Sequence, residues 1–230
     1  MGTVNKPSPL MELAFTLLLP SLILMKLSSP EQLGVVNALL LALALPLGWG
    51  VMDWVRNRKL NLFAALGLVS VLLTGGIGLL KLDTQWLAIK EAAIPAILAL
   101  VVVGSNYTRY PLIRTVLFNQ RLMQVDKVQE QLAIRGTQYE FENRLRIANW
   151  AFGSTFIFSA TMNYFLATYI VTSPSGTAAF NEELGQLTLV SYPIIALPSM
   201  LMLLAVLYYL ARSIRSLAGL GLTEVMNGVE

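Results

Sequence analysis

NLFAALGLVSVLLTGGIGLLKLDTQWLAIKEAAIPAILALVVVGSNYT, residues 61–108, decides the fold of this chain. Two apolar runs flank a short polar joint, and the second run carries Lys90, Glu91 and Pro95. Each run has about the 20 residues that an α-helix needs to cross a bilayer. Two opposite charges and a helix-breaking proline are costly inside such a run, so they mark a candidate working site.

The composition is that of a membrane protein. The 230 residues have a mean hydropathy of +0.65, and only 13% are charged, whereas soluble domains average about 25%. The absence of Cys and His excludes thiolate nucleophiles and removes the commonest metal ligand and general base. We therefore expect no catalytic residues, no metal and no cofactor, and a protein that is not an enzyme. The net charge of +3 reflects topology, and we expect no nucleic-acid partner.

Six apolar runs follow one another along the chain. They cover about 10–25, 33–54, 62–82, 86–105, 148–171 and 187–210. Strands of a membrane β-barrel would be about half as long and would alternate. The sequence therefore predicts an all-α polytopic membrane protein, residues 1–230, as one bundle of six transmembrane helices. The first run lacks a small-residue cleavage site after it and is expected to be an uncleaved span.

The basic residues predict the orientation of the bundle. The fourth loop holds seven of the 16 Lys and Arg residues, and the fifth loop, 172–186, holds none. Six spans with both termini inside place 13 of the 16 on the cytoplasmic side. The positive-inside rule therefore predicts cytoplasmic N- and C-termini.

The segment 109–147 is expected to be a cytoplasmic amphipathic helix between spans four and five. Apolar side chains recur among its basic ones, namely Leu112, Val116 and Met123. In one interpretation Arg114, Arg121 and Lys127 anchor it to anionic lipid headgroups. In the other, the same residues form a gate or a surface that binds a partner. Thr137 and Glu140 have the spacing of a capping box, which predicts a helix that starts there and continues into span five.

Prolines interrupt four of the six spans. They are Pro20, Pro46, Pro95 and Pro198, and each frees a carbonyl four residues earlier, on Thr16, Ala42, Glu91 and Ile194 respectively. Freed carbonyls can coordinate cations or water, as in the broken helices of transporters. The alternative is that these prolines only kink the helices for packing.

Three charged residues fall inside the predicted spans: Glu12, Lys90 and Glu91. Neighbours on a helix point about 100° apart, so we expect that Lys90 and Glu91 do not simply face one another. One of them then needs a partner on another helix, in water or among headgroups, and Lys90 is long enough to snorkel outward. Glu91 is either part of a pair at the membrane edge or, if it faces the bundle, a proton or cation carrier.

A polar stripe runs along span five. Thr155, Ser159 and Asn163 recur every four residues, on one slowly drifting helix face. Such stripes hold helices together in bilayers, and they also line solute paths. Both interpretations stay open.

Several stretches resemble an uncharacterised family of bacterial multi-pass inner-membrane proteins, related more distantly to the intracellular septation protein A group. They are NLFAALGLVSVLLTGGIGLLKLD, AIKEAAIPAILALVVVGS, TRYPLIRTVLFN, IVTSPSGTAAFNEELG and SYPIIALPSM; they are spread over residues 61–200, so the resemblance extends over most of the chain. The resemblance implies the bacterial inner membrane and a link to the cell envelope and division. It carries no site residues over.

Two functions are consistent with these patterns. The first is a small-solute or ion permease, expected to form a homodimer, in which Glu91 or Glu12 binds a proton or cation. The second is a scaffold or regulator of envelope machinery that docks a partner through the loops 109–146 and 172–186. In a permease Glu91 should face a water-filled cavity, whereas in a scaffold it should be paired with one basic partner.

Overall fold

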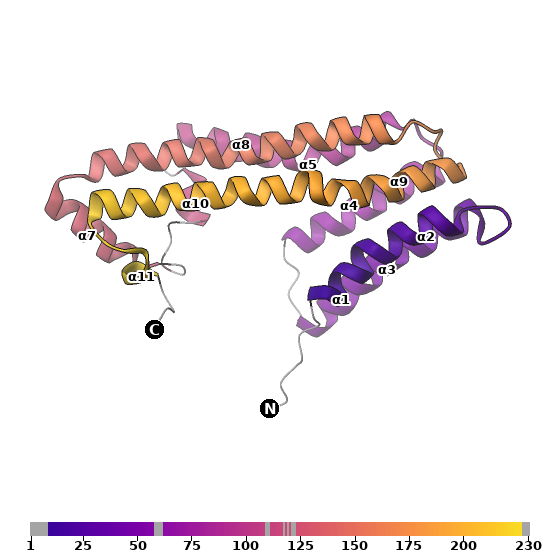
Figure 1. Ribbon diagram of the computed structural model, residues 1–230, viewed down its shortest axis with the longest axis horizontal. Helices are drawn as coiled ribbons and strands as arrows, with labels where there is room; N and C mark the ends of the chain where they lie inside the picture. Colours follow the sequence, from indigo (N-terminus) through magenta and orange to yellow (C-terminus); the bar gives the residue numbers. More distant parts are fainter. Residues whose placement is uncertain are drawn as a thin grey trace, which may run out of the picture. The chain divides into compact units, whose positions relative to one another are not determined.

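The computed structural model describes residues 9–57, 62–108, 111–116, 118, 120 and 123–226 (Figure 1). Over these residues the chain is helical, and its one isolated β-bridge joins Met123 and Met226. Four helical runs are long and apolar enough to cross a membrane: Leu10–Leu27, Gly34–Met52, Gln85–Tyr107 and Ala178–Ala218. The all-α fold is therefore confirmed over the described residues, the four apolar runs support a membrane protein, and the count of six spans stays a prediction.

Two compact units divide the chain. Unit 1 comprises Met1–Ala93 and Thr161–Ile195, and unit 2 comprises Ile94–Ala160 and Ala196–Glu230. Helices α5 (Gln85–Gly104) and α8 (Gln138–Ile170) contribute residues to both units. We describe each unit in turn.

Unit 1 contains the N-terminal helices. Its complete elements are α1 (Pro9–Leu13), a π-helical turn (Ala14–Leu18), α2 (Leu19–Leu27), α3 (Gly34–Asn57), α4 (Leu62–Leu79) and α9 (Ala178–Ser191). Helix α2 packs against α3 and α9, and α3 packs against α4. Gly185 permits the close approach of α9 to α2, because a Cβ there would lie 2.8 Å from the Ser21 carbonyl oxygen.

A buried asparagine ties α9 to the turn between α2 and α3. The Asn181 side chain is fully buried, and its Nδ2 donates to Ser28 Oγ at 3.0 Å and to the Val35 carbonyl at 2.9 Å. The apolar core around it contains Leu39, Leu87 and Phe180, all nearly inaccessible to solvent. Unit 1 is thus stabilised by its apolar core and by the two hydrogen bonds of the Asn181 side chain.

Unit 2 has its own apolar core at the C-terminal end of α10 (Leu197–Ala218). Three short helices contribute to unit 2 at this end, namely α6 (Leu112–Val116), α7 (Val125–Arg135) and α11 (Leu222–Val225). The fully buried side chains of Ile113, Val128 and Leu145 belong to this core. The Gln124 amide donates to the Val225 carbonyl at 2.7 Å, which fastens the start of α7 to α11.

The amphipathic helix that we expected between spans four and five stays a prediction; the described residues of 109–147 form α6, α7 and the start of α8. Helix α6 ends at Val116, and Met123 lies in the isolated bridge rather than on a helix. The apolar side of α7 packs into protein, since Val128 and Leu132 are buried in the core of unit 2. The predicted start at Thr137 is confirmed, because α8 begins at Gln138 and the Phe141 amide donates to the Thr137 carbonyl.

The predicted loop 172–186 is too long. Helix α9 begins at Ala178, and the Thr177 side chain accepts a hydrogen bond from the Phe180 amide as its N-cap. The turn-forming residues end at Gly176, whose φ is +81°. The helical run that we predicted for 187–210 therefore extends from Ala178 through a π-helical turn, Tyr192–Ala196, to Ala218.

Candidate functional site

Lys90 and Glu91 form an ion pair on α5, within unit 1. The Lys90 Nζ lies 2.6 Å from the Glu91 Oε1. The Lys90 side chain is only 9% exposed and that of Glu91 is 28% exposed. Both charges lie in a run that is apolar enough to cross a membrane, Gln85–Tyr107.

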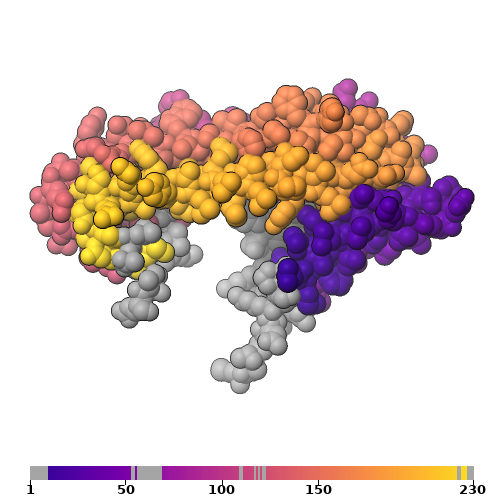
Figure 2. Space-filling model, in the orientation of Figure 1, coloured from indigo at the N-terminus to yellow at the C-terminus, as the bar shows by residue number. Residues whose placement is uncertain are grey.

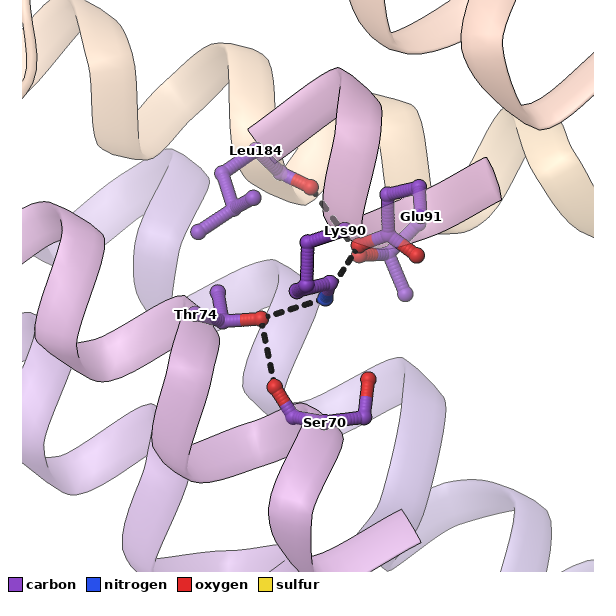
Figure 3. A network of polar contacts seen from close by, with 6 residues as sticks. Ser70, Thr74, Lys90, Glu91 and Leu184 are labelled. Atoms are coloured by element: carbon purple, nitrogen blue, oxygen red, sulfur yellow. Dashed lines mark hydrogen bonds and ion pairs between the residues drawn. The ribbon is translucent and has the colours of Figure 1, made fainter. Parts of the chain in front are cut away.

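A second helix completes this arrangement. The Lys90 ammonium also donates to Thr74 Oγ1 at 2.7 Å, and the Thr74 hydroxyl donates to the Ser70 carbonyl at 3.0 Å (Figure 3). Thr74 thus accepts one hydrogen bond and donates another, and these hydrogen bonds join α5 to α4. We call Thr74, Lys90 and Glu91 the ion-pair site.

The expectation that Lys90 and Glu91 do not face one another is wrong. Their Cα–Cβ bonds do point about 100° apart on a helix, but the lysine ammonium stands on a four-carbon stem that can reach around. Lys90 does not snorkel either, since its ammonium is buried and bonded to α4. The expectation that one of the two finds a partner on another helix is met by Thr74.

The electrostatics of the ion-pair site favour pairing over separation. Removing two charges from water carries a desolvation penalty of several kcal/mol per ion, and only close pairing with added hydrogen bonds offsets it. Here the contact is short and Thr74 supplies a further acceptor.

The other predicted site residues lie elsewhere. Glu12 is exposed on α1, where its carbonyl oxygen accepts from the Thr16 hydroxyl at 2.7 Å. Pro95 follows Glu91 by four residues on α5, is half-buried, and leaves the helix continuous from Gln85 to Gly104. On α8, Thr155 is buried and its hydroxyl donates to the Phe152 carbonyl at 2.7 Å. Ser159 and Asn163 are half-buried on the same helix.

The four prolines behave in two ways. Pro20 follows the π-helical turn Ala14–Leu18, and Pro198 follows the π-helical turn Tyr192–Ala196. Each turn contains the residue whose carbonyl the proline frees, so the missing hydrogen bond coincides with a local widening of the helix. Pro46 and Pro95 lie inside continuous α-helix. Cation coordination by the freed carbonyls stays a prediction.

The candidate lipid-contact residues have partners within the chain. Arg114 forms an ion pair with Glu142 at 2.8 Å, and the Lys127 ammonium donates to the Glu224 carbonyl at 3.1 Å. Arg121 lies outside the described residues. The two described side chains hold unit 2 together, and their contact with lipid or a partner stays a prediction.

Sequence reasoning missed the polar residues that organise both units. Thr74 precedes the glycines of span three, and only the fold shows that it faces Lys90. Asn149 is fully buried in unit 2, where its Oδ1 accepts from the Ile113 amide and its Nδ2 donates to the Val102 carbonyl. A polar residue within an apolar run was the available signal for each, but other polar residues in the same runs gave the same signal.

Within the described ranges, no group of three or more His, Cys, Asp or Glu side chains is placed to hold a metal ion. No protein-family model, curated protein or solved structure matches the chain.

Proposed function

We propose that the protein is an integral protein of the bacterial inner membrane, with six spans and cytoplasmic N- and C-termini. Four apolar helical runs and the distribution of Lys and Arg support this proposal. The resemblance to the septation protein A group points to the same compartment.

The orientation can be tested directly, because the chain has no cysteine. Single cysteines would replace Lys127 in unit 2 and Glu182 at the start of α9, both of which are exposed. In spheroplasts, a membrane-impermeant maleimide should label Glu182→Cys at once and Lys127→Cys only after permeabilisation. The reverse pattern would invert the topology, and labelling of both before permeabilisation would contradict the span count.

We further propose that the protein is a permease for an ion or a small solute, with the ion-pair site as its working centre. The observation that carries this proposal is a partly buried Lys90–Glu91 pair that is bonded to a second helix and lies inside an apolar run. Ionisable residues within membrane spans are rare and commonly mark proton or ion pathways. A proton or cation would displace Lys90 from Glu91 and loosen the bond between α5 and α4.

The second candidate function is a non-transporting scaffold or regulator of envelope machinery. One observation favours it: Glu91 is paired with a single basic partner, as we expected for a scaffold. The resemblance points the same way. In this case the ion pair is structural, and a partner protein would bind to the cytoplasmic or outer surface. That the protein is not an enzyme stays a prediction.

Ion and proton flux in proteoliposomes separates the two functions. For a permease, we expect flux above empty liposomes that Glu91→Gln abolishes, because the amide cannot carry a proton but still offers Lys90 an acceptor. Glu31→Gln is the matched control, since Glu31 is exposed in the turn after α2. For a scaffold, no flux appears, Glu91→Gln is nearly silent, and neutralising Arg114, Arg121 and Lys127 removes a crosslinked partner.

A further inference from the structure

A groove of about 1060 Å³ lies at the C-terminal end of α10, within unit 2. It is lined by Tyr208, Arg212 and Arg215 of α10 and by Gly219 and Glu224, which follow α10 in the chain. Figure 2 shows the side chains of α10 and α11, orange to yellow, on the face in view. The groove therefore borders the end of a run that can cross a membrane, Ala178–Ala218.

Two arginines of α10 line this groove, and a third, Arg135 of α7, lies against the lining residue Gly219. Arg212 and Arg215 are exposed on α10. The Arg135 guanidinium lies against Gly219, because a Cβ on that glycine would overlap it. The end of α7 that carries Arg135 is held to α10 by the Thr137 hydroxyl, which donates to the Leu217 carbonyl at 3.0 Å.

The groove has an excess of positive charge. Its one described carboxylate is Glu224, whose Oε2 accepts from the Gly221 amide at 2.6 Å. Among the residues that the structure describes, none of the three arginines takes part in an ion pair. Guanidinium groups bind phosphate oxygens through paired hydrogen bonds, so the complementary ligand is a phosphate.

An apolar track leads to these arginines along one face of α10. Leu197, Leu201, Leu204 and Tyr208 follow one another at helical spacing, and they are 46%, 63%, 51% and 66% exposed. The same face continues to Arg212 and Arg215. An exposed helix face that changes from apolar to basic matches a molecule with an acyl chain and an anionic headgroup.

We propose that this groove binds an anionic phospholipid, with its phosphate at Arg135, Arg212 and Arg215 and an acyl chain along the track. The apolar track distinguishes a lipid from free phosphate, which would use only the arginines. The proposal is independent of whether the protein transports a solute, and its arginines are distinct from Arg114 and Lys127, which have partners within unit 2.

Native mass spectrometry of the detergent-solubilised chain tests the proposal. Phosphatidylglycerol and phosphatidylcholine would be titrated onto the wild type and onto Arg212→Gln/Arg215→Gln. We expect the double variant to bind phosphatidylglycerol about 25-fold more weakly, from the usual contribution of two basic residues near an anionic surface. Binding of phosphatidylcholine should not change.

Two further variants and one soluble probe make the outcome decisive. Lys26→Gln, at an exposed lysine near the end of α2, should leave phosphatidylglycerol binding unchanged. Arg212→Lys/Arg215→Lys should retain more binding than the Gln variant, because it keeps the charge but loses the planar fork. Equal binding by wild type and the Gln double variant, an equal loss in Lys26→Gln, or glycerol phosphate binding as tightly as the lipid would each overturn the proposal.

Discussion

The two units contain ion pairs of similar length in very different surroundings. In unit 1, Lys90 and Glu91 are 2.6 Å apart, with the ammonium side chain 9% exposed. In unit 2, Arg144 and Glu140 are also 2.6 Å apart, but their side chains are 28% and 53% exposed. Water screens the second pair and leaves it a small net energy, whereas the first pair depends on its partners remaining in place. Distance alone therefore does not rank these contacts.

Glu91→Leu should have the largest effect, because it leaves a buried ammonium with Thr74 as its remaining described acceptor. We expect the free energy of unfolding to fall by about 3 kcal/mol, the usual loss when one member of a buried pair is removed. Unfolding in mixed micelles, followed by far-UV circular dichroism, measures it. The double variant Lys90→Met/Glu91→Leu should regain most of the loss, and a single variant as stable as the wild type would contradict the comparison.

Thr74→Val should have an intermediate effect, since it keeps the shape of the side chain but removes the second acceptor of Lys90. We expect a loss of about 1.5 kcal/mol, as for a hydrogen bond to a charged group. Thr168→Val is the matched control, because the Thr168 hydroxyl is exposed and donates only to the Tyr164 carbonyl in its own helix. Equal losses in the two variants would show that Thr74 has no special role.

Glu140→Gln should have the smallest effect. The exposed pair with Arg144 spans four residues of one helix, and such pairs contribute about 0.3–0.5 kcal/mol. The same unfolding assay should give a change near this value that shrinks further when salt is added. A loss above about 1 kcal/mol would mean that this pair is as important to unit 2 as the Lys90 pair is to unit 1.

The apolar runs predicted the helix bounds well where polar residues mark the ends of a run. Helix α5 spans Gln85–Gly104 against a predicted 86–105, and α8 begins at the predicted Thr137 boundary. Run length is a local signal and sufficed for α5. At α8 the start is as predicted, but the Thr137 hydroxyl donates to the Leu217 carbonyl and Glu140 pairs with Arg144. The division into compact units was not predicted, and the prediction of a single domain stays open.

The contacts of the candidate site could not be predicted in the same way. Lys90 and Thr74 are separated by 16 residues, and only the packing of α4 beside α5 brings them together. The Lys90–Glu91 ion pair was not predicted, because the directions of the Cα–Cβ bonds do not limit how far the flexible Lys90 side chain can reach. The burial of Val128 and Leu132 was not predicted, because they pack in one core with Leu210 of α10, which lies far away in sequence.

The turn between α8 and α9 is ordered by one carboxylate. Glu183 accepts hydrogen bonds from the backbone amides and from the hydroxyl groups of both Thr172 and Ser173, at 2.7–3.3 Å. These residues lose their conformational freedom when the chain folds. A molecule that later touches this turn would meet a preorganised surface, and its affinity would not be reduced by the entropy of ordering a loop.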